Sequence, residues 1–516
     1  MAFFLTLVFL IPGCFCNDDS GDDDSDDDLP EIEAQYSIIV NASHGFGQIA
    51  PIHGVNNGPW INTDWDLCQG LWYSADYSEK FNQTMIPSSR THGEGPGDMN
   101  RIWKHLDSEG IPIYDGYDPL NASNYDFSES DERISKTMGT SHTQVYWRLG
   151  YSKGGPAVEN CPDWRAPPDN FTVFAQAAVQ VLKHYREGWA DGYYYDNFNV
   201  VEVWNEPYLS DWWSGTPDQY FEMYHEINSA VTTEFGETID VVAALELSEG
   251  RIDFSQRFLE LAQQSNEPID AVYVHLYRTN PSQTIFNLYG DLNNSVESLL
   301  DQYGYPKNTP VYITEWNRNI PVYAQSVSSQ SYLMSVLTIY NELWEGNQGN
   351  STLGHTNLRM AHFFASRSFM WNANLTPKPP GHTWEIYGEM ISETPERLFV
   401  EGGHNSNSID SDELNILAGK SVTDDKVNIL ITRYVAPASE VPNHFSEINE
   451  TISLTLTDLG WGECQYDWEM WALVDSNSTP WQLQDSGTDS GDFSITNFEM
   501  NQRTYHLIQI ERNQCQ

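Results

Sequence analysis

Two glutamates of this 516-residue chain stand in segments suited to acid–base and nucleophilic chemistry. Glu206 follows the apolar run 200–204 and one asparagine, and Glu315 follows the run 310–314. A single glutamate at the end of a strand is more often a salt-bridging or capping residue. Two of them in such similar settings, each with Asn and Trp as near neighbours, predict a catalytic pair.

Cleaving a glycosidic bond with retention of configuration needs two such groups. One carboxylic acid protonates the leaving oxygen, and one carboxylate about 5 to 5.5 Å away attacks the anomeric carbon. Asn205, next to the first glutamate, has a side chain that can hydrogen-bond the adjacent ring hydroxyl, an interaction that strengthens in the transition state. The pattern therefore predicts carbohydrate cleavage, provided that the fold brings both glutamates together.

A (β/α)8 barrel meets that condition because its catalytic residues lie at the C-terminal ends of its strands. Short apolar runs alternate with helical stretches from about residue 36 to 395, as in repeated βα units. Since Glu315 comes 109 residues after Glu206 and a unit takes about 30 to 45 residues, we expect them on strands four and seven. The clearest runs are 144–149, 200–204, 239–244, 271–275, 310–314 and 360–364.

Helices between these runs have local signals of their own. Apolar residues recur at helical spacing over 170–186. Thr216 is the expected N-cap of another helix, with Pro217 at its first position and Gln219 at the spacing of a capping box.

After about residue 396 the sequence pattern changes to that of successive strands without long helices. This pattern predicts a β-sandwich over 396–516. The barrel is then expected over 36–395, with 36–45 as a segment that can pair with the sandwich. The expected sandwich strands are 414–417, 427–434, 452–456, 467–473 and 504–510.

The formal charge of −49 limits the classes of partner that the protein is expected to bind. A strongly acidic surface repels nucleic acid and anionic membranes, so we expect a carbohydrate substrate and no nucleic acid. Such a surface also suits salty, marine surroundings. The chain has 18 Trp and 28 Tyr residues, whose flat faces suit sugar rings but also fill cores.

The first residues indicate export. Residues 3–13 are apolar but shorter than the roughly 20 residues of a spanning helix, so 1–13 is expected to be a signal peptide and 14–35 an acidic disordered linker. Cys14 follows a segment that resembles a bacterial lipobox. Two alternatives stay open: lipidation of Cys14 with an outer-membrane anchor, or ordinary cleavage. The expected location is secreted or on the bacterial cell surface as a lipoprotein.

Four further cysteines allow three pairings. Export favours disulfides, and we expect Cys68–Cys161 and Cys464–Cys515, each within one predicted domain. His225-Glu226 is followed by Ser229 where a zinc protease would have His. We therefore expect no metal and no cofactor.

The motifs Trp204-Asn-Glu206-Pro and Thr314-Glu315-Trp-Asn, in this order and spacing, resemble glycoside hydrolase family 39, which includes β-xylosidases and α-L-iduronidases. The resemblance covers nearly the whole mature chain. It implies a clan A (β/α)8 barrel joined to a β-sandwich, with Glu206 as acid/base and Glu315 as nucleophile.

The resemblance also implies a wider sugar site. His275 and Tyr277 match the family's His-x-Tyr on strand six, with Tyr277 bonded to the nucleophile. Trp316, beside the nucleophile, and Trp371, near strand eight, are expected to bind substrate. The tip of strand three, 146–150, and the end of strand two, Arg90-Thr-His92, depart from a typical xylosidase, which leaves the substrate open.

Five basic residues, His53, Arg90, His92, Arg148 and Arg278, are expected near strand tips, and the first four are further candidates for substrate binding. Arg pairs bidentately with anions, so one interpretation is a pocket for a sulfated or uronic sugar. The favoured interpretation is that these residues brace the glutamates or pair with acidic loop residues.

The main hypothesis is a retaining glycoside hydrolase that cleaves an extracellular poly- or oligosaccharide by double displacement. Two alternatives remain. One is a clan A glycosidase of another family that acts on an algal galactan, xylan or mannan. The other is a carbohydrate-binding protein that keeps the barrel without catalysis.

Overall fold

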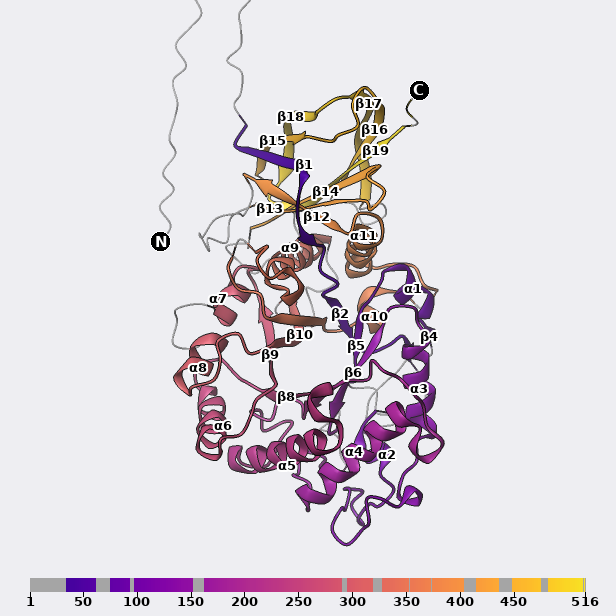
Figure 1. Ribbon diagram of the computed structural model, residues 1–516, viewed down its shortest axis with the longest axis vertical. Helices are drawn as coiled ribbons and strands as arrows, with labels where there is room; N and C mark the ends of the chain where they lie inside the picture. The colour runs from indigo at the N-terminus through magenta and orange to yellow at the C-terminus, as the bar shows by residue number, and fades with distance from the viewer. Residues whose placement is uncertain are drawn as a thin grey trace, which may run out of the picture. The chain divides into compact units, whose positions relative to one another are not determined.

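The computed structural model describes residues 34–61, 75–92, 97–151, 162–289, 295–318, 327–351, 353–372, 374–402, 414–435, 448–474, 481–513 and 515. The expected signal peptide and Cys14 lie outside these residues, as do Cys68 and Cys161. The described chain contains a closed barrel and a nine-stranded sheet (Figure 1). Within it, no helix has the length and apolar character needed to cross a membrane.

The barrel consists of eight strands, neighbours in parallel pairing, in the closed order β10-β11-β2-β5-β6-β7-β8-β9. Together with the sheet, it confirms the predicted (β/α)8 barrel with a C-terminal β-sandwich. In chain order the strands are β2 (His53–Asn56), β5 (Ser88–Arg90), β6 (Gln144–Leu149), β7 (Val200–Val203), β8 (Asp240–Ala244), β9 (Ala271–Arg278), β10 (Val311–Arg318) and β11 (Leu358–Phe363).

Helices follow most barrel strands and cover the barrel's outside. The predicted cap of α5 is confirmed: the Thr216 side chain accepts a hydrogen bond from the Gln219 N–H, and Gln219 bonds back to Thr216. The helices are α1 (Ser78–Gln83), α2 (Met99–Ile102), α3 (Ser128–Met138), α4 (Phe171–Glu187), α5 (Pro217–Phe235), α6 (Ile252–Ser265), α7 (Gln283–Tyr289), α8 (Val296–Gln302), α9 (Val327–Leu343), α10 (Arg367–Met370) and α11 (Pro379–Glu393). Short 3₁₀ helices are η1 (Ala122–Asn124), η2 (Trp189–Asp191), η3 (Gly236–Thr238) and η4 (Glu345–Asn347).

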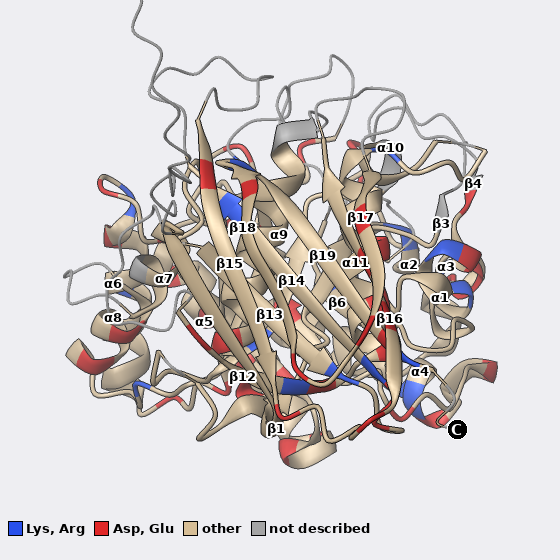
Figure 2. Ribbon diagram, turned by 90° about the horizontal axis from the view of Figure 1, so that it is seen from above, with Lys and Arg blue, Asp and Glu red and all other residues tan. Residues whose placement is uncertain are grey.

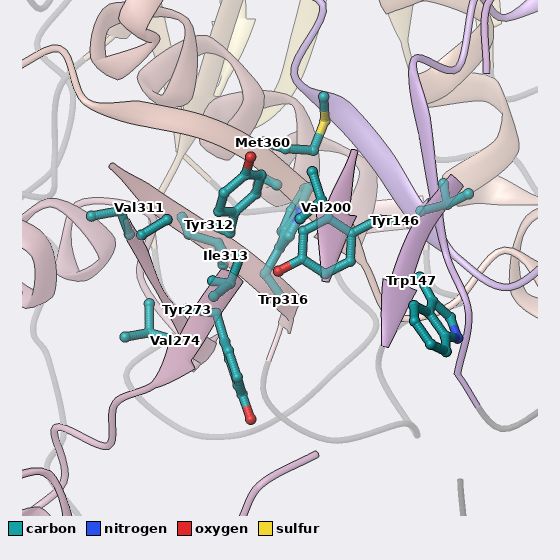
Figure 3. Close-up of a cluster of buried hydrophobic side chains, with 14 of the residues drawn as sticks. Tyr146, Trp147, Val200, Tyr273, Val274, Val311, Tyr312, Ile313, Trp316 and Met360 are labelled. Carbon is teal, nitrogen blue, oxygen red and sulfur yellow. The ribbon is translucent and has the colours of Figure 1, made fainter. Parts of the chain in front are cut away.

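Side chains fill the barrel's interior, as they do in other (β/α)8 barrels. Tyr146 on β6 and Tyr312 on β10 meet with ring centroids 5.1 Å apart (Figure 3). The ring centroid of His362 on β11 lies 4.7 Å from that of Tyr146. These residues are almost completely buried. The barrel therefore has a packed core, and chemistry is confined to its ends.

The nine-stranded sheet has the order β17-β16-β19-β14-β13-β12-β1-β15-β18 (Figure 2). Its ends face each other, because Trp468 of β16 and Phe493 of β18 have ring centroids 5.5 Å apart. The strands are β1 (Tyr36–Gln48), β12 (Glu396–Glu401), β13 (Leu414–Lys420), β14 (Lys426–Tyr434), β15 (Asn449–Thr457), β16 (Gln465–Leu473), β17 (Trp481–Ser490), β18 (Phe493–Asn501) and β19 (Arg503–Arg512). A separate pair contains β3 (Trp60–Ile61) and β4 (Ala75–Asp76).

The first strand of the chain lies inside the C-terminal sheet. β1 pairs antiparallel with β12 and parallel with β15, which Figure 1 shows as an indigo strand among orange and yellow ones. Its buried residues, such as Ile38 and Val40, join the sandwich core. The chain thus enters the sandwich, builds the barrel and returns.

Helix α9 joins the barrel to the sandwich. Ser335 Oγ lies 2.8 Å from Thr432 Oγ1 of β14, and the Tyr505 hydroxyl of β19 donates to Gln330, 3.0 Å away. β14 is buried on both faces, one against the sandwich core and one against α9. The barrel core and the outer face of this sheet therefore form one apolar cluster.

The predicted pairing of Cys464 with Cys515 is confirmed. This disulfide ties the start of β16 to the residues just after β19, the strand it pairs with. The predicted Cys68–Cys161 bond falls outside the described residues.

Candidate active site

Both glutamates lie at the C-terminal end of the barrel, on the strands that the spacing predicted. Glu206 follows β7, the fourth barrel strand, and Glu315 lies on β10, the seventh. The backbone turns sharply after β7, since Trp204 has φ 66° and Glu206 has φ 44°. One oxygen of each glutamate and one ring nitrogen of His275 lie within 4.8 Å of one another.

Glu315 is held through both of its oxygens. Arg90 Nη1 donates to Oε1 at 2.9 Å, and the Tyr277 hydroxyl donates to Oε2 at 2.6 Å. Burial, reinforced by the nearby Glu315 carboxylate, raises the pKa of Tyr277 well above its usual value, so this hydroxyl keeps its proton. His92 Nε2 lies 3.6 Å from Oε1. These contacts fix the plane of a carboxylate that is itself only 5% exposed.

Arg90, at the end of β5, is completely buried and uses all five of its N–H donors. Nε and Nη2 bind the two oxygens of Glu202, with Nε at 2.9 Å. The remaining hydrogens bond Asn205 Oδ1 at 2.8 Å, and Asn56 Oδ1 and Glu315 Oε1 at 2.9 Å each. Burial lowers the pKa of Arg90, but Glu202 and Glu315 outweigh this and raise it, so the guanidinium stays charged.

Glu206 is bonded to His275 of β9. His275 Nδ1 lies 2.9 Å from Glu206 Oε1, and its Nε2 lies 3.1 Å from Thr314 Oγ1. Burial lowers the pKa of His275, but Glu315 and Glu206 together raise it above 6.5. A protonated His275 then donates to Glu206 and lies 3.6 Å from Glu315 Oε2, which links the two carboxylates.

Asn205 lies between these groups. Its Oδ1 accepts from Arg90, while Nδ2 is buried and bonds no atom of the residues that the structure describes. An amide N–H next to both glutamates is therefore available to a ligand hydroxyl, and the role of Asn205 in substrate binding stays a prediction.

The structure does not place both predicted tryptophans in the site. Trp316 is 1% exposed and stacks on Trp384 of α11, with ring centroids 5.9 Å apart. Successive residues of a strand point to opposite sides, so Glu315 faces the site and Trp316 faces the helices. Trp371 is buried against Tyr77 and Phe81. The predictions that these two side chains bind substrate are therefore wrong.

The aromatic ring beside the site at the end of strand eight is Phe364. Its centroid lies 5.8 Å from that of His92 and 6.4 Å from that of Tyr277. The aromatic run around 363–364 was visible in the sequence, but only the packed barrel shows which ring turns toward the glutamates.

Two of the four basic candidates bond to groups other than Glu206 and Glu315. His53 begins β2, at the opposite end of the barrel, where its Nε2 lies 2.8 Å from the Thr84 carbonyl and burial lowers its pKa to about 4. The proposal that His53 binds substrate is therefore wrong. Arg148 is buried and pairs with Asp98. Arg90 and His92 are the two that contact Glu315, as the bracing interpretation expected.

Sequence reasoning missed Glu202 and Asn56. Glu202 lies on β7, the strand that precedes Glu206, and was visible as the one acid in an apolar run. Asn56 ends β2; its Nδ2 donates to the Thr314 carbonyl at 2.8 Å, and its Oδ1 accepts from Arg90.

The atoms of Glu206, His275 and Glu315 are close enough to meet around a metal ion. The surrounding donors do not fit one. Arg90 brings a positive charge to Glu315 Oε1, Tyr277 donates to Oε2, and His275 has a raised pKa and binds Glu206. We assign these atoms to a network that shares protons rather than to a metal centre.

Fold and site together define a (β/α)8 protein of the glycosidase type, with a glutamate after its fourth strand and another on its seventh. Residues 177–393, which include both glutamates, match the family model described as "Glycosyl hydrolases family 39". Over these residues the chain is similar to glycoside hydrolase family 39.

Known proteins resemble this chain in sequence or in fold. A β-xylosidase of Geobacillus stearothermophilus is 24% identical over 193 residues, which cover 33% of this chain and 36% of the relative's length. A glucosidase from Croceicoccus marinus has a TM-score of 0.69 and 18% identity over 94% of this chain and 100% of that one. A monomeric β-xylosidase from Caulobacter crescentus has a TM-score of 0.63 and 15% identity over 92% and 99%. These two structures share the fold.

The raised pKa of His275 gives a testable dependence of stability on pH. A group whose pKa is higher in the folded state stabilises the fold fully below its unfolded pKa of 6.5, and this contribution is lost as pH rises through the folded value. We expect the free energy of unfolding of the wild type, relative to His275→Gln, to fall as pH increases above 6.5. Denaturant unfolding of both proteins from pH 5 to 9 checks this. Parallel pH profiles would contradict it.

Proposed function

We propose that the protein is a retaining glycoside hydrolase that cleaves extracellular poly- or oligosaccharides by double displacement. The observation that supports retention is the short separation of the glutamates, with one oxygen of each within 4.8 Å of the other. Retaining enzymes have carboxyl groups about 5 to 5.5 Å apart, whereas inverting enzymes keep about 6.5 to 9.5 Å to admit a water.

In the first step Glu315 attacks the anomeric carbon, and the bond to the leaving oxygen breaks as Glu206 protonates that oxygen. The bonds from Arg90 and Tyr277 orient the attacking carboxylate and limit its rotation. His275 occupies Glu206 Oε1, so we assign the transferred proton to Oε2. The products of this step are a glycosyl ester on Glu315 and a free alcohol.

In the second step water replaces the ester. Glu206, now a carboxylate, takes a proton from the water as its oxygen bonds to the anomeric carbon and the ester bond to Glu315 breaks. Two inversions give net retention, and both glutamates return to their starting protonation states. Asn205 Nδ2 is the donor for the neighbouring ring hydroxyl in both transition states.

A neutral sugar is the proposed occupant of the position next to Glu315. The guanidinium closest to the nucleophile, that of Arg90, has all its N–H donors bound to protein acceptors, and Arg148 pairs with Asp98. Arg90 therefore offers no free fork for a sulfate or uronate. The similarity to a β-xylosidase and a glucosidase supports a first panel of aryl xylosides and glucosides, with an aryl glucuronide as the anionic comparison.

The first test removes the nucleophile. We expect Glu315→Ala to lower turnover of aryl glycosides by at least roughly a thousandfold, because no covalent intermediate can form. Azide, which fits the space left by the carboxylate, should restore part of the rate and give a glycosyl azide of inverted configuration, measured by NMR. Ordinary activity in this variant would remove Glu315 from the mechanism.

The second test separates the acid from the nucleophile. We expect Glu206→Ala to slow substrates with poor leaving groups by about 10²–10⁴-fold, since these need protonation, and to affect activated aryl glycosides much less in the first step. Rates for a series of aryl glycosides with different leaving-group pKa values measure this. Equal losses across the series would contradict the acid role.

We also propose that the protein is exported and anchored by lipid at Cys14. The apolar segment 3–13 and the acidic spacer after it support export, and the Cys464–Cys515 disulfide suits an oxidising compartment. Cys14→Ser should move the protein from the membrane fraction to the soluble fraction of a bacterial host. A wild type that is released in soluble form would favour ordinary cleavage instead.

A further inference from the structure

We propose that Glu202 is a positioning residue that limits how strongly Arg90 binds the nucleophile, an inference that rests on the function proposed above. Glu202 lies on β7, four residues before Glu206, and is completely buried in the barrel interior. Its carboxylate binds Arg90 through both oxygens. It therefore acts on the reaction only through that arginine.

The geometry of Arg90 shows how the limit arises. A guanidinium binds a carboxylate most strongly when two parallel N–H groups face its two oxygens. Glu202 occupies such a pair, Nε and Nη2. Glu315 receives one N–H, from Nη1, through one oxygen at 2.9 Å, and the second Nη1 hydrogen goes to Asn56. Arg90 thus makes its two-point contact with Glu202, which does not react, and a one-point contact with the nucleophile Glu315.

The charges have the same consequence. One guanidinium lies between two buried carboxylates, so its charge is divided between Glu202 and Glu315. If Glu202 were neutral, the whole charge would act on Glu315. A carboxylate that is more strongly stabilised by a cation holds a proton less readily and is a weaker nucleophile. Arg90 thus favours the charged form of Glu315, and Glu202 limits how far the arginine weakens it as a nucleophile.

Other groups near the pair do not replace this charge. Burial raises the pKa of Tyr146 and Tyr273 around Glu202, and of Tyr277 and Tyr208 near Glu315, so these hydroxyls stay neutral. Among the described residues, further charged or titratable neighbours are His92, His275 and Glu206 on the side of Glu315, and Tyr220 and Arg148, itself paired with Asp98, on the side of Glu202. His362 lies near Arg90, and burial lowers its pKa well below the usual value, so its ring is neutral.

The experiment replaces Glu202 by glutamine, which keeps the shape and removes the charge. Arg90 stays held by Asn56, Asn205 and Glu315, so its full charge acts on the nucleophile. We expect kcat/KM for an activated aryl glycoside to fall by about tenfold, mainly through kcat, and the acidic limb of its pH profile to move down by roughly one unit.

A matched control is Glu450→Gln. Glu450 also makes a buried two-point pair, with Arg433 at 2.7 and 2.8 Å, but lies in the sandwich. Both variants should lose thermal stability, and only Glu202→Gln should shift the pH profile. A purely structural role for Glu202 would let Arg90 leave Glu315 and move the acidic limb upward. An unchanged or upward-shifted limb overturns the proposal.

Two further measurements cover the remaining outcomes. If Glu202→Gln does not fold, Glu202→Asp keeps the charge but moves the carboxylate away from Arg90, and a smaller downward shift is expected. Independently of activity, the titration midpoint of the Glu315 carboxyl resonance, assigned by its loss in Glu315→Gln, should be lower in the Glu202 variant. A wild type inactive on every glycoside contradicts the proposed function, whereas an unmoved midpoint contradicts the role of Glu202 alone.

Discussion

The site depends on one constraint: a buried guanidinium must find partners for its charge and for every N–H. Arg90 meets this constraint with acceptors from three other barrel strands and the loop after one of them. Those acceptors are Asn56, Glu202, Asn205 and Glu315. The barrel fold by itself would only place these residues at the same end of the barrel. The arginine gives them a fixed arrangement, and the nucleophile's orientation follows from it.

The fold supplies rigidity to the two glutamates in different ways. Glu315 lies within β10, so its position follows from the strand pairing with β9 and from Trp316, which anchors the strand against α11. Glu206 lies just beyond β7 on a backbone with φ 44°, a conformation that non-glycine residues seldom adopt and that the surrounding structure must hold. The Tyr273 hydroxyl donates to the Trp204 carbonyl at 3.0 Å and helps to hold the backbone turn before Glu206.

The sequence alone could predict those features that a short-range pattern of residues determines. Apolar runs placed six barrel strands, the helix cap at Thr216 was visible in three residues, and the spacing put Glu206 and Glu315 on strands four and seven. The pairing of Arg90 with Glu202 joins residues 112 apart and needs the closed barrel. The prediction for Trp316 was wrong because the whole motif around Glu315 was assigned to the substrate site. In a strand, consecutive side chains point to opposite sides, so Glu315 and Trp316 cannot both face the site. β17 escaped prediction because its exposed, polar residues show no apolar alternation.

The position of β1 has a consequence for how the protein is made. Residues 36–48 leave the ribosome early, yet their partners are 396–401 and 449–457. Until those strands emerge, β1 presents unpaired backbone groups and apolar residues such as Ile38 and Val40. Final assembly of the sandwich is therefore a late, non-local event, slow by the usual relation between contact order and rate. A chain truncated after the barrel would keep Glu206 and Glu315. It would still lack β12 and β15, the strands that pair with β1.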